Sequence, residues 1–420
     1  MFSTRPPVRA RPPRLPAARL GARASLTAAA LLLAGACVSA PRVVPPAELP
    51  ALEARVAETP DDEALRRLLA VSLVEADRCR EAVATAEGVS ADADRAWPVL
   101  VRGRCLERSG RVEAAVSLYE AYLDSFTAAA GATPVRGQLL LARERMAVLR
   151  VRGADAGTLP DPPDSVVAVL PLEVVGPQRF RPLGRGLAAQ ITSDLLLLDR
   201  VRLVERAGLQ AILDELALAR SPLVDSTTAP SFGRVVQAGR LVDGTVEIPA
   251  DERLGMRGAV VLGDGRVVPT DRLEGSLEDL LDLQKELVFA IADRLGHPVS
   301  AAERARILEN GTRSLRAFLA WAEGLELADR GDYAAAAARF AEAYRIDGGF
   351  AGAREMLDAS VGAHELRDRG AAALTLPTGE MARRAREVLA GGDLQGPDPV
   401  DGAVTSALND VAPTQGEQAM

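Results

Sequence analysis

The residue with the most distinctive chemical setting is Cys37, a thiol that directly follows a short apolar segment. Six arginines and no acidic residue precede it, namely Arg5, Arg9, Arg11, Arg14, Arg19 and Arg23. The apolar segment runs from Leu26 to Ala36 and ends in small residues. A basic start, a short apolar core and small residues at the cleavage point are typical of a secretory signal, too short to span a bilayer. The sequence therefore predicts that residues 1–36 direct export and are then removed.

The run that ends at this cysteine reads Leu33-Ala34-Gly35-Ala36-Cys37. It resembles the lipobox of bacterial lipoproteins, although Ala34 stands where the usual pattern has leucine. The resemblance implies that Cys37 is diacylated and becomes the new N-terminus. Val38, rather than aspartate, follows the cysteine, which implies the outer membrane, with the chain facing the periplasm. The alternative is ordinary cleavage near Ala36 or Ala40, with Cys37 incidental.

The other two cysteines, Cys79 and Cys105, are candidates for a disulfide. Thiols in an exported protein are able to pair, whereas a spacer of 25 residues is not a zinc-binding spacing. In paired helices, Cys79 would begin the second helix of one unit and Cys105 would lie late in the first helix of the next. The Cα separation decides between a disulfide and two free thiols, and sequence does not supply it.

Other residues could support chemistry, but their context favours structural roles. Gly184-Arg-Gly186 could hold a phosphate at a helix start, yet it lacks a third glycine and any Gly-Lys-Ser/Thr. Asp194, Glu205 and Asp214 lie in amphipathic segments, where a solvated charge is the usual state.

The two histidines of the chain, His297 and His364, have no serine or cysteine arrangement typical of nucleophilic catalysis and offer few metal ligands. We therefore predict a protein that is not an enzyme and has no cofactor and no metal.

Composition limits the class of protein and of partner. The 420 residues suffice for two or three domains, and with only 3% aromatic residues the cores must be built from Ala, Leu and Val. Lys285 is the one lysine among 50 basic residues, which suggests a GC-rich genome rather than a function. Removing the six signal arginines lowers the formal charge from −8 to −14, which argues against nucleic acid as a partner. No later segment is apolar enough to span a membrane, so only the acyl anchor would hold the chain there.

Residues 37–50 are interpreted as a tether, and residues 51–150 predict paired helices with an internal period. Ala70, Asp77 and Ala82 recur 33 residues later as Gly103, Gly110 and Ala115. With Leu106 and Tyr119, this pattern resembles tetratricopeptide repeats, whose small residues let paired helices approach closely. The first unit is degenerate because Ala86 replaces the expected aromatic residue. A further helix at residues 138–150 is expected to cap these units.

A third copy of the pattern lies at residues 312–350. Its matching residues are Gly324, Leu327, Gly331, Asp332, Tyr333, Ala336, Phe340, Ala343 and Asp347. The alternative is an unrelated alanine-rich helical hairpin. Residues 351–389 are expected to form a helical extension, and residues 390–420 a disordered tail. Because one helical pair cannot bury its apolar face alone, we expect the third copy to pack onto the preceding domain.

Between these helical regions, a linker at residues 151–163 leads into an α/β domain at residues 164–298. Strand patterns occur at residues 165–170, 201–204, 242–248, 254–262 and 266–268. Helical periodicity occurs at residues 183–198, 209–216, 276–295 and 300–308. The first two strands are separated by a helix and should be parallel. The turn at Asp264-Gly265 predicts an antiparallel hairpin, and Pro269 places its last strand at an edge.

The motifs of this domain, in order, are Val167-Ala-Val-Leu-Pro171, Leu183-Gly-Arg-Gly-Leu187, Ile191-Thr-Ser-Asp-Leu195, Val204-Glu-Arg206, Leu209-x2-Ile212-Leu-x-Glu215 and Leu241-Val-Asp-Gly-Thr-Val246. Their order and spacing resemble the fold shared by the curli-secretion lipoprotein CsgG, the flagellar lipoprotein FlgO, the penicillin-binding-protein activator LpoB and the N-terminal domain of TolB. The resemblance covers about residues 164–296. It implies an envelope lipoprotein domain that assembles with other proteins or regulates them.

These observations predict a membrane-anchored lipoprotein that acts as a non-enzymatic scaffold or assembly factor for an envelope complex, of secretion, curli-like, flagellar or cell-wall type. Partner proteins would bind concave surfaces of the helical repeats, and a homo-oligomer is compatible with the sequence. One alternative is a pore-forming component of CsgG type, although the hairpin at residues 254–268 is shorter than the strands of about 9–11 residues that span a membrane. The other alternative is a small-ligand-binding α/β domain.

Overall fold

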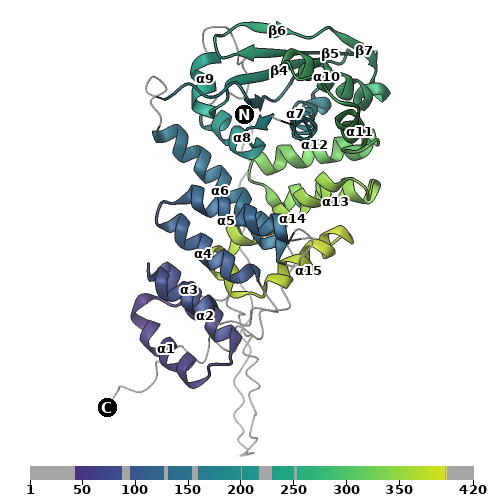
Figure 1. The fold of residues 1–420 in the computed structure, drawn as a ribbon. Coiled ribbons are helices and arrows are strands. Elements are labelled where there is room, and N and C mark those ends of the chain that lie inside the picture. Colours follow the sequence, from purple (N-terminus) through teal and green to yellow (C-terminus); the bar gives the residue numbers. More distant parts are fainter. Residues whose placement is uncertain are drawn as a thin grey trace, which may run out of the picture. The chain divides into compact units, whose positions relative to one another are not determined.

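The computed structural model describes residues 43–87, 95–126, 131–153, 159–199, 201–216, 229–249 and 253–392, together with residue 394. In this part of the chain, helices predominate and one mixed sheet of seven strands is present (Figure 1). This confirms the predicted combination of an α/β domain with additional helices. The predicted signal, Cys37 and nearly all of the predicted tail lie outside the described residues. No helix among the described residues is both long and apolar enough to cross a membrane.

The sheet has the strand order β3-β1-β4-β5-β6, with β2 alongside β4 and β7 alongside β5. The strands are β1 (Val166–Val169), β2 (Glu173–Val175), β3 (Arg202–Leu203), β4 (Arg240–Glu247), β5 (Arg253–Leu262), β6 (Val267–Pro269) and β7 (Leu273–Ser276). β1 pairs in parallel with β3, as the helical crossover predicts, and also with β4. β2 and β7 were not predicted, because strands of three and four residues are too short for a clear alternating pattern.

The longest antiparallel pair joins β4 to β5, so the hairpin expected at residues 254–268 is not the only one. One face of this pair is buried against α7 (Leu183–Leu195) and α10 (Leu280–Arg294), through residues such as Val242, Val246 and Val260. α8 (Arg206–Glu215) and α9 (Ala229–Val236) pack against the opposite face of the sheet. Both faces of the parallel part are therefore covered, as is usual for parallel strands.

The remaining helices form hairpins that precede and follow the α/β domain in the sequence. They are α1 (Leu49–Glu58), α2 (Glu63–Glu75), α3 (Cys79–Glu87), α4 (Ala96–Arg108), α5 (Val112–Ser125), α6 (Ala132–Gly153), α11 (Ala301–Glu309), α12 (Leu315–Asp329), α13 (Tyr333–Ile346), α14 (Ala351–Arg369) and α15 (Thr378–Leu389). Short 3-10 helices are η1 (Pro46–Glu48), η2 (Gln178–Phe180), η3 (Leu277–Asp279) and η4 (Gly370–Thr375). Each helix of α1 to α6 packs against its neighbours in sequence, as does each of α12 to α14.

The hairpins α2/α3, α4/α5 and α12/α13 turn in the same way. The second residue after the first helix is left-handed in each, with φ of 59° at Asp77, 79° at Gly110 and 77° at Gly331. The following N–H then bonds back to a leucine carbonyl, at distances of 2.9, 2.8 and 3.0 Å to Leu73, Leu106 and Leu327 in turn. These are the bonds of a Schellman motif, which satisfies carbonyls at the helix end.

Small residues bring the helices of these hairpins together. A Cβ on Gly103 would lie 2.1 Å from the Tyr119 hydroxyl, and a Cβ on Gly324 would lie 2.6 Å from the Phe340 ring. In the first hairpin, Ala70 and Ala86 occupy the corresponding positions and both are fully buried. The physical basis of the predicted repeat is therefore present, while membership of the tetratricopeptide family stays a prediction.

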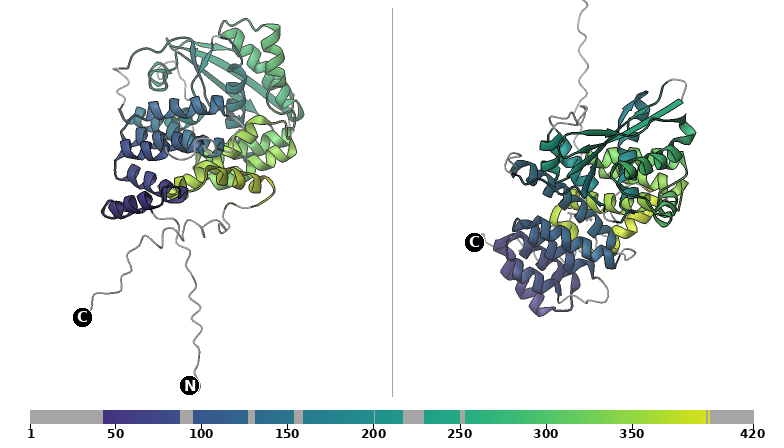
Figure 2. Two further views of the ribbon diagram at one scale, coloured as in Figure 1. Left: turned by 60° about the horizontal axis from the view of Figure 1, so that its bottom comes forward. Right: turned by 45° about the horizontal axis from the view of Figure 1, so that its top comes forward.

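The two helical regions contact each other, although the α/β domain lies between them in the sequence. α14 packs along α6, so that the hairpins before and after the α/β domain form one continuous helical layer (Figure 2). The contact depends on two glycines, because a Cβ on Gly137 would lie 2.3 Å from the Gly362 carbonyl carbon. The local sequence patterns of α6 and α14 do not predict that these helices contact each other, because the whole α/β domain separates the two glycines in the sequence.

Gly137→Ala should lower the free energy of unfolding by roughly 1–3 kcal/mol, because the added methyl group overpacks a backbone contact that cannot move as a flexible side chain would. Gly153→Ala, in the same helix, is the matched control, since nothing lies within 4 Å of its Cβ position. The control should be neutral or slightly stabilising, as expected for alanine in a helix. Urea denaturation followed by circular dichroism measures both. Equal stability of the two variants would contradict this account of the crossing.

Candidate functional site

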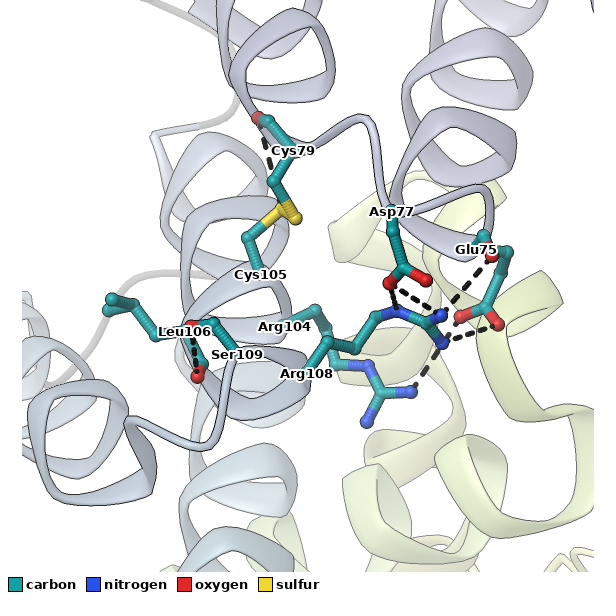
Figure 3. Close-up of a disulfide and its surroundings, with 8 residues drawn as sticks. All are labelled: Glu75, Asp77, Cys79, Arg104, Cys105, Leu106, Arg108 and Ser109. Carbon is teal, nitrogen blue, oxygen red and sulfur yellow. Dashed lines mark hydrogen bonds and ion pairs between the residues drawn. A yellow bond between two sulfur atoms is a disulfide. The ribbon is translucent and has the colours of Figure 1, made fainter.

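The two cysteines proposed to pair are joined in a disulfide, with their Cα atoms 5.6 Å apart (Figure 3). Cys79 is the first residue of α3 and Cys105 lies near the end of α4, as the repeat register predicts. The bond therefore ties the hairpin α2/α3 to the hairpin α4/α5. Arg108 adds ion pairs to Glu75 at 3.0 Å and Asp77 at 2.8 Å, which are exposed and so contribute little.

The soluble protein without its signal and Cys37 should show no free thiol when denatured without reductant. Reduction should lower the stability of the N-terminal hairpins by up to roughly 3 kcal/mol, because the open chain regains the entropy of a loop closed by the bond. Thiol titration and a melting curve with and without reductant check this, with a Cys79→Ser/Cys105→Ser variant that should be insensitive to reductant. Two titratable thiols in the denatured wild-type chain would rule the disulfide out.

The glycines of Gly184-Arg-Gly186 lie in the first turn of α7 and serve packing. A Cβ on Gly184 would lie 2.1 Å from the Leu172 carbonyl oxygen, and one on Gly186 would lie 2.7 Å from Ala322 in α12. This agrees with the prediction of a helix start rather than a phosphate loop. His297 hydrogen-bonds to Glu303 at 3.1 Å.

The structure separates the three carboxylates that were considered for acid–base chemistry. Glu205 caps α8 by accepting hydrogen bonds from the backbone N–H groups of Ala207 and Gly208 at 3.0 and 2.8 Å. Asp214 accepts from Gln210 at 2.8 Å, and burial raises its pKa. No group of three or more His, Cys, Asp and Glu residues suited to a metal occurs in the part of the chain that the structure describes.

Asp194 contradicts the expectation of a solvated carboxylate, because it is fully buried. Lys285, the only lysine of the chain, donates to both of its oxygens at 2.8 Å and also to the Asn310 carbonyl at 2.8 Å. Gln284 and the Asn310 amide each donate a further hydrogen bond to Asp194, at 2.8 Å. Burial lowers the pKa of Lys285, and the Asp194 carboxylate opposes that shift.

This buried pair joins three elements, namely α7, α10 and the turn after α11. Gly311, at φ of 94°, completes the turn and lies against the Gln190 side chain. The carboxylate is therefore fully satisfied by protein donors, which suits a structural hub better than a proton-transfer site. The sequence feature that could have pointed to this buried pair is the presence of a single lysine in an arginine-rich chain. Composition alone did not assign a role to that lysine.

A second charged group lies where the helical layer meets the α/β domain. Asp329, at the end of α12, pairs with Arg185 of α7 at 3.0 Å and Arg206 of α8 at 2.8 Å. Beside it, the Tyr333 hydroxyl donates to Glu144 of α6 at 2.7 Å, and burial raises the pKa of Glu144. With the Phe318 and Ala322 contacts on Gly186, these bonds confirm that the hairpin at residues 312–350 packs on the α/β domain.

One surface expected to receive partners is covered by the chain itself. η4 and the residues after it pack on α2 and α4, with Ala373 and Leu374 buried in their apolar cluster. The Trp97 indole donates to the Leu374 carbonyl at 2.8 Å, and Arg67 donates to the Leu376 carbonyl at 3.3 Å. The side of the N-terminal hairpins formed by α2 and α4 therefore does not offer the open concave surface that was predicted.

An open cavity of about 450 Å³ lies elsewhere, between the helical layer and the edge of the sheet. α5, α6, β3 and α8 form its walls, together with the segment before β1. Its apolar lining includes Val116, Met146, Ala147, Val166, Val204, Ile212 and Val236. This volume is within the range of small-molecule and peptide pockets.

The acidic residues of the cavity wall are all paired, two of them with the same arginine. Glu120 and Glu205 both pair with Arg143, at 2.9 and 3.6 Å. Asp161 pairs with Arg234 at 3.4 Å, so each acidic residue of the wall has a cation.

Two arginines of the same wall lack a carboxylate. Among the described residues, Arg150 has no hydrogen-bond or ion-pair partner. Arg202 donates a hydrogen bond to the Ser165 hydroxyl at 3.3 Å and has no carboxylate partner among those residues. With Arg234 counted, four arginines face three acidic residues here, so the site carries one surplus positive charge. Local sequence patterns did not predict this site, because its walls come from several elements that are far apart in the sequence.

Comparisons with known proteins found no matching family model, no similar curated protein and no similar solved structure.

Proposed function

We propose that this protein is an envelope lipoprotein, anchored at Cys37, that acts as a non-enzymatic scaffold or assembly factor for other envelope proteins. The observation that carries the proposal is the helical layer, in which hairpins from both ends of the chain stack on the α/β domain. Outside the side of α2 and α4 that the chain itself covers, stacked hairpins of this kind present continuous surfaces, which suit the binding of proteins better than the enclosure of a reaction. The export signal and the acylated cysteine would place the protein at a membrane of the cell envelope.

The internal bonds support the same proposal. A disulfide holds the first two hairpins in register, and the ion pairs of Asp329 hold the helical layer against the α/β domain. The Asp194–Lys285 pair fixes α7 against α10 within that domain. Rigid presentation of a surface reduces the entropy lost on binding. The resemblance of the domain motifs to envelope lipoproteins agrees with this reading.

Cells supplied with a labelled fatty acid should acylate the wild-type protein and not Cys37→Ala. Partners are then captured with a photo-crosslinking residue in place of Leu149, which is 50% exposed on α6. Amine-reactive reagents are unsuitable, because the one lysine is buried. We expect crosslinks to envelope proteins from the wild-type membrane fraction and fewer from Cys37→Ala. Equal labelling of both proteins, or an absence of crosslinks from several exposed positions, would contradict the proposal.

A further inference from the structure

We infer that the cavity between α6, β3 and α8 binds the C-terminal end of an extended peptide, one that finishes in an apolar side chain and a free carboxylate. The inference rests on the proposed scaffold function and deepens it by naming the chemistry of the partner. Three features of the cavity converge on this ligand: an open strand edge, an apolar interior and two arginines without carboxylate partners.

The first feature is the edge of the sheet at β3. The N–H groups of Arg202 and Val204 bond inward to β1, at 3.0 and 2.9 Å. Because main-chain groups alternate along a strand, the N–H and C=O of Leu203 point outward, away from β1. β3 is the terminal strand of the sheet, and Leu203 lines the cavity. An extended peptide can pair with such an edge by adding a strand.

The second feature is the interior beside that edge. Val204 and Val166 face the same side of the sheet as Ile212 of α8, and Met146 closes the cavity from α6. A strand added at β3 would direct alternate side chains toward this side. The volume of about 450 Å³ accommodates one or two aliphatic side chains and the backbone that carries them.

The third feature is the charge at the rim. Arg150 and Arg202 come from different elements and lack carboxylate partners among the described residues, whereas every acidic side chain of the wall is paired. An arginine guanidinium binds a carboxylate through two parallel hydrogen bonds. A terminal carboxylate would balance this charge, while an internal peptide segment would not.

A fatty acid shares the apolar body and the anionic head, and its carboxylate could accept from the outward N–H of Leu203, but it has no N–H to donate to the outward Leu203 carbonyl. The strand edge therefore favours a peptide over an acyl chain.

The test uses an arrayed library of octapeptides with randomised last three positions, each made with a free C-terminal carboxylate and as the C-terminal amide, and the full mature protein. We expect binding of peptides that end in aliphatic residues, and about ten-fold or greater loss of affinity for the amides. Arg150→Ala/Arg202→Ala should lose the discrimination between acid and amide. Arg257→Ala, on an exposed position of β5, is the matched control and should retain it.

Met146→Trp should block peptide binding by filling the cavity while leaving the fold intact, because Met146 is only partly buried. Dodecanoate is tested as the competing ligand class. Binding of dodecanoate without binding of any peptide would overturn the inference in favour of an acyl anion, and binding of neither would overturn it outright. Neither result bears on acylation of Cys37 or on crosslinking in the membrane, so failure here is distinguishable from failure of the scaffold proposal.

Discussion

Lys285→Met should lower the free energy of unfolding by about 3–5 kcal/mol, the usual effect of removing one partner of a buried ion pair. The variant keeps the length of the side chain but leaves Asp194 buried without its counter-charge. The remaining donors, Gln284, Gln190 and Asn310, cannot neutralise a carboxylate that has no exposure to solvent. Chemical denaturation followed by circular dichroism measures the difference. An Asp194→Asn/Lys285→Met double variant should recover part of the loss, because no buried charge remains.

Lys285→Arg is the sharper test, since the chain uses arginine at every other basic position. A lysine ammonium is compact and directs three donors at two carboxylate oxygens and one carbonyl, whereas a guanidinium is planar and wider. We expect Lys285→Arg to cost roughly 1–3 kcal/mol through overpacking. Arg257→Lys, an exposed exchange in the opposite direction, should change stability by less than about 0.5 kcal/mol. A fully stable Lys285→Arg variant would show that charge alone matters at this position.

The buried lysine also supplies its own probe. An amine-reactive reagent should modify Lys285 slowly in the native protein and rapidly in denaturant, because only 11% of its side chain is exposed. With one lysine in the chain, the modification is assigned without ambiguity once the N-terminal amine is accounted for.

Phe340→Ala should cost roughly 3–5 kcal/mol, as expected for removing a fully buried aromatic ring. The ring is 0% exposed and fills the space that Gly324 leaves on the neighbouring helix. Phe289→Ala is the control, because that ring is only partly buried, beneath the Arg304 guanidinium. The control should therefore be less destabilising.

The same variant tests whether the last hairpins and the α/β domain unfold together. Phe318, Trp321 and Phe340 belong to one apolar cluster with the strand residues Val242 and Val260. We therefore expect a single transition that shifts as a whole in Phe340→Ala. Two separate transitions, with only one shifted, would show that the hairpin at residues 312–350 is an independent arm.

Local sequence patterns predicted most of the secondary structure and the hairpin turns, but not the short strands β2 and β7 or the helix α9. The alternation at residues 242–248 and 254–262 predicts β4 and β5, because side chains alternate faces along a strand. The 33-residue recurrence that includes Asp77 and Gly110 predicts the turns, since left-handed backbone favours glycine and a few short polar residues. The same recurrence predicts the positions of Cys79 and Cys105 on neighbouring helices. These features depend on residues close in the sequence.

Only the tertiary structure decided which of these elements meet. Asp194 reads as a surface carboxylate within its own helix, and its burial follows from Lys285, 91 residues later. The contact of Gly137 with Gly362, the covering of α2 and α4 by residues after Gly370, and the cavity at β3 likewise join distant segments. Periodicity reports which face of an element is apolar, but not which other element covers it. The sequence by itself therefore determined most of the elements and their turns, while the buried charges and the candidate site arose only from long-range packing.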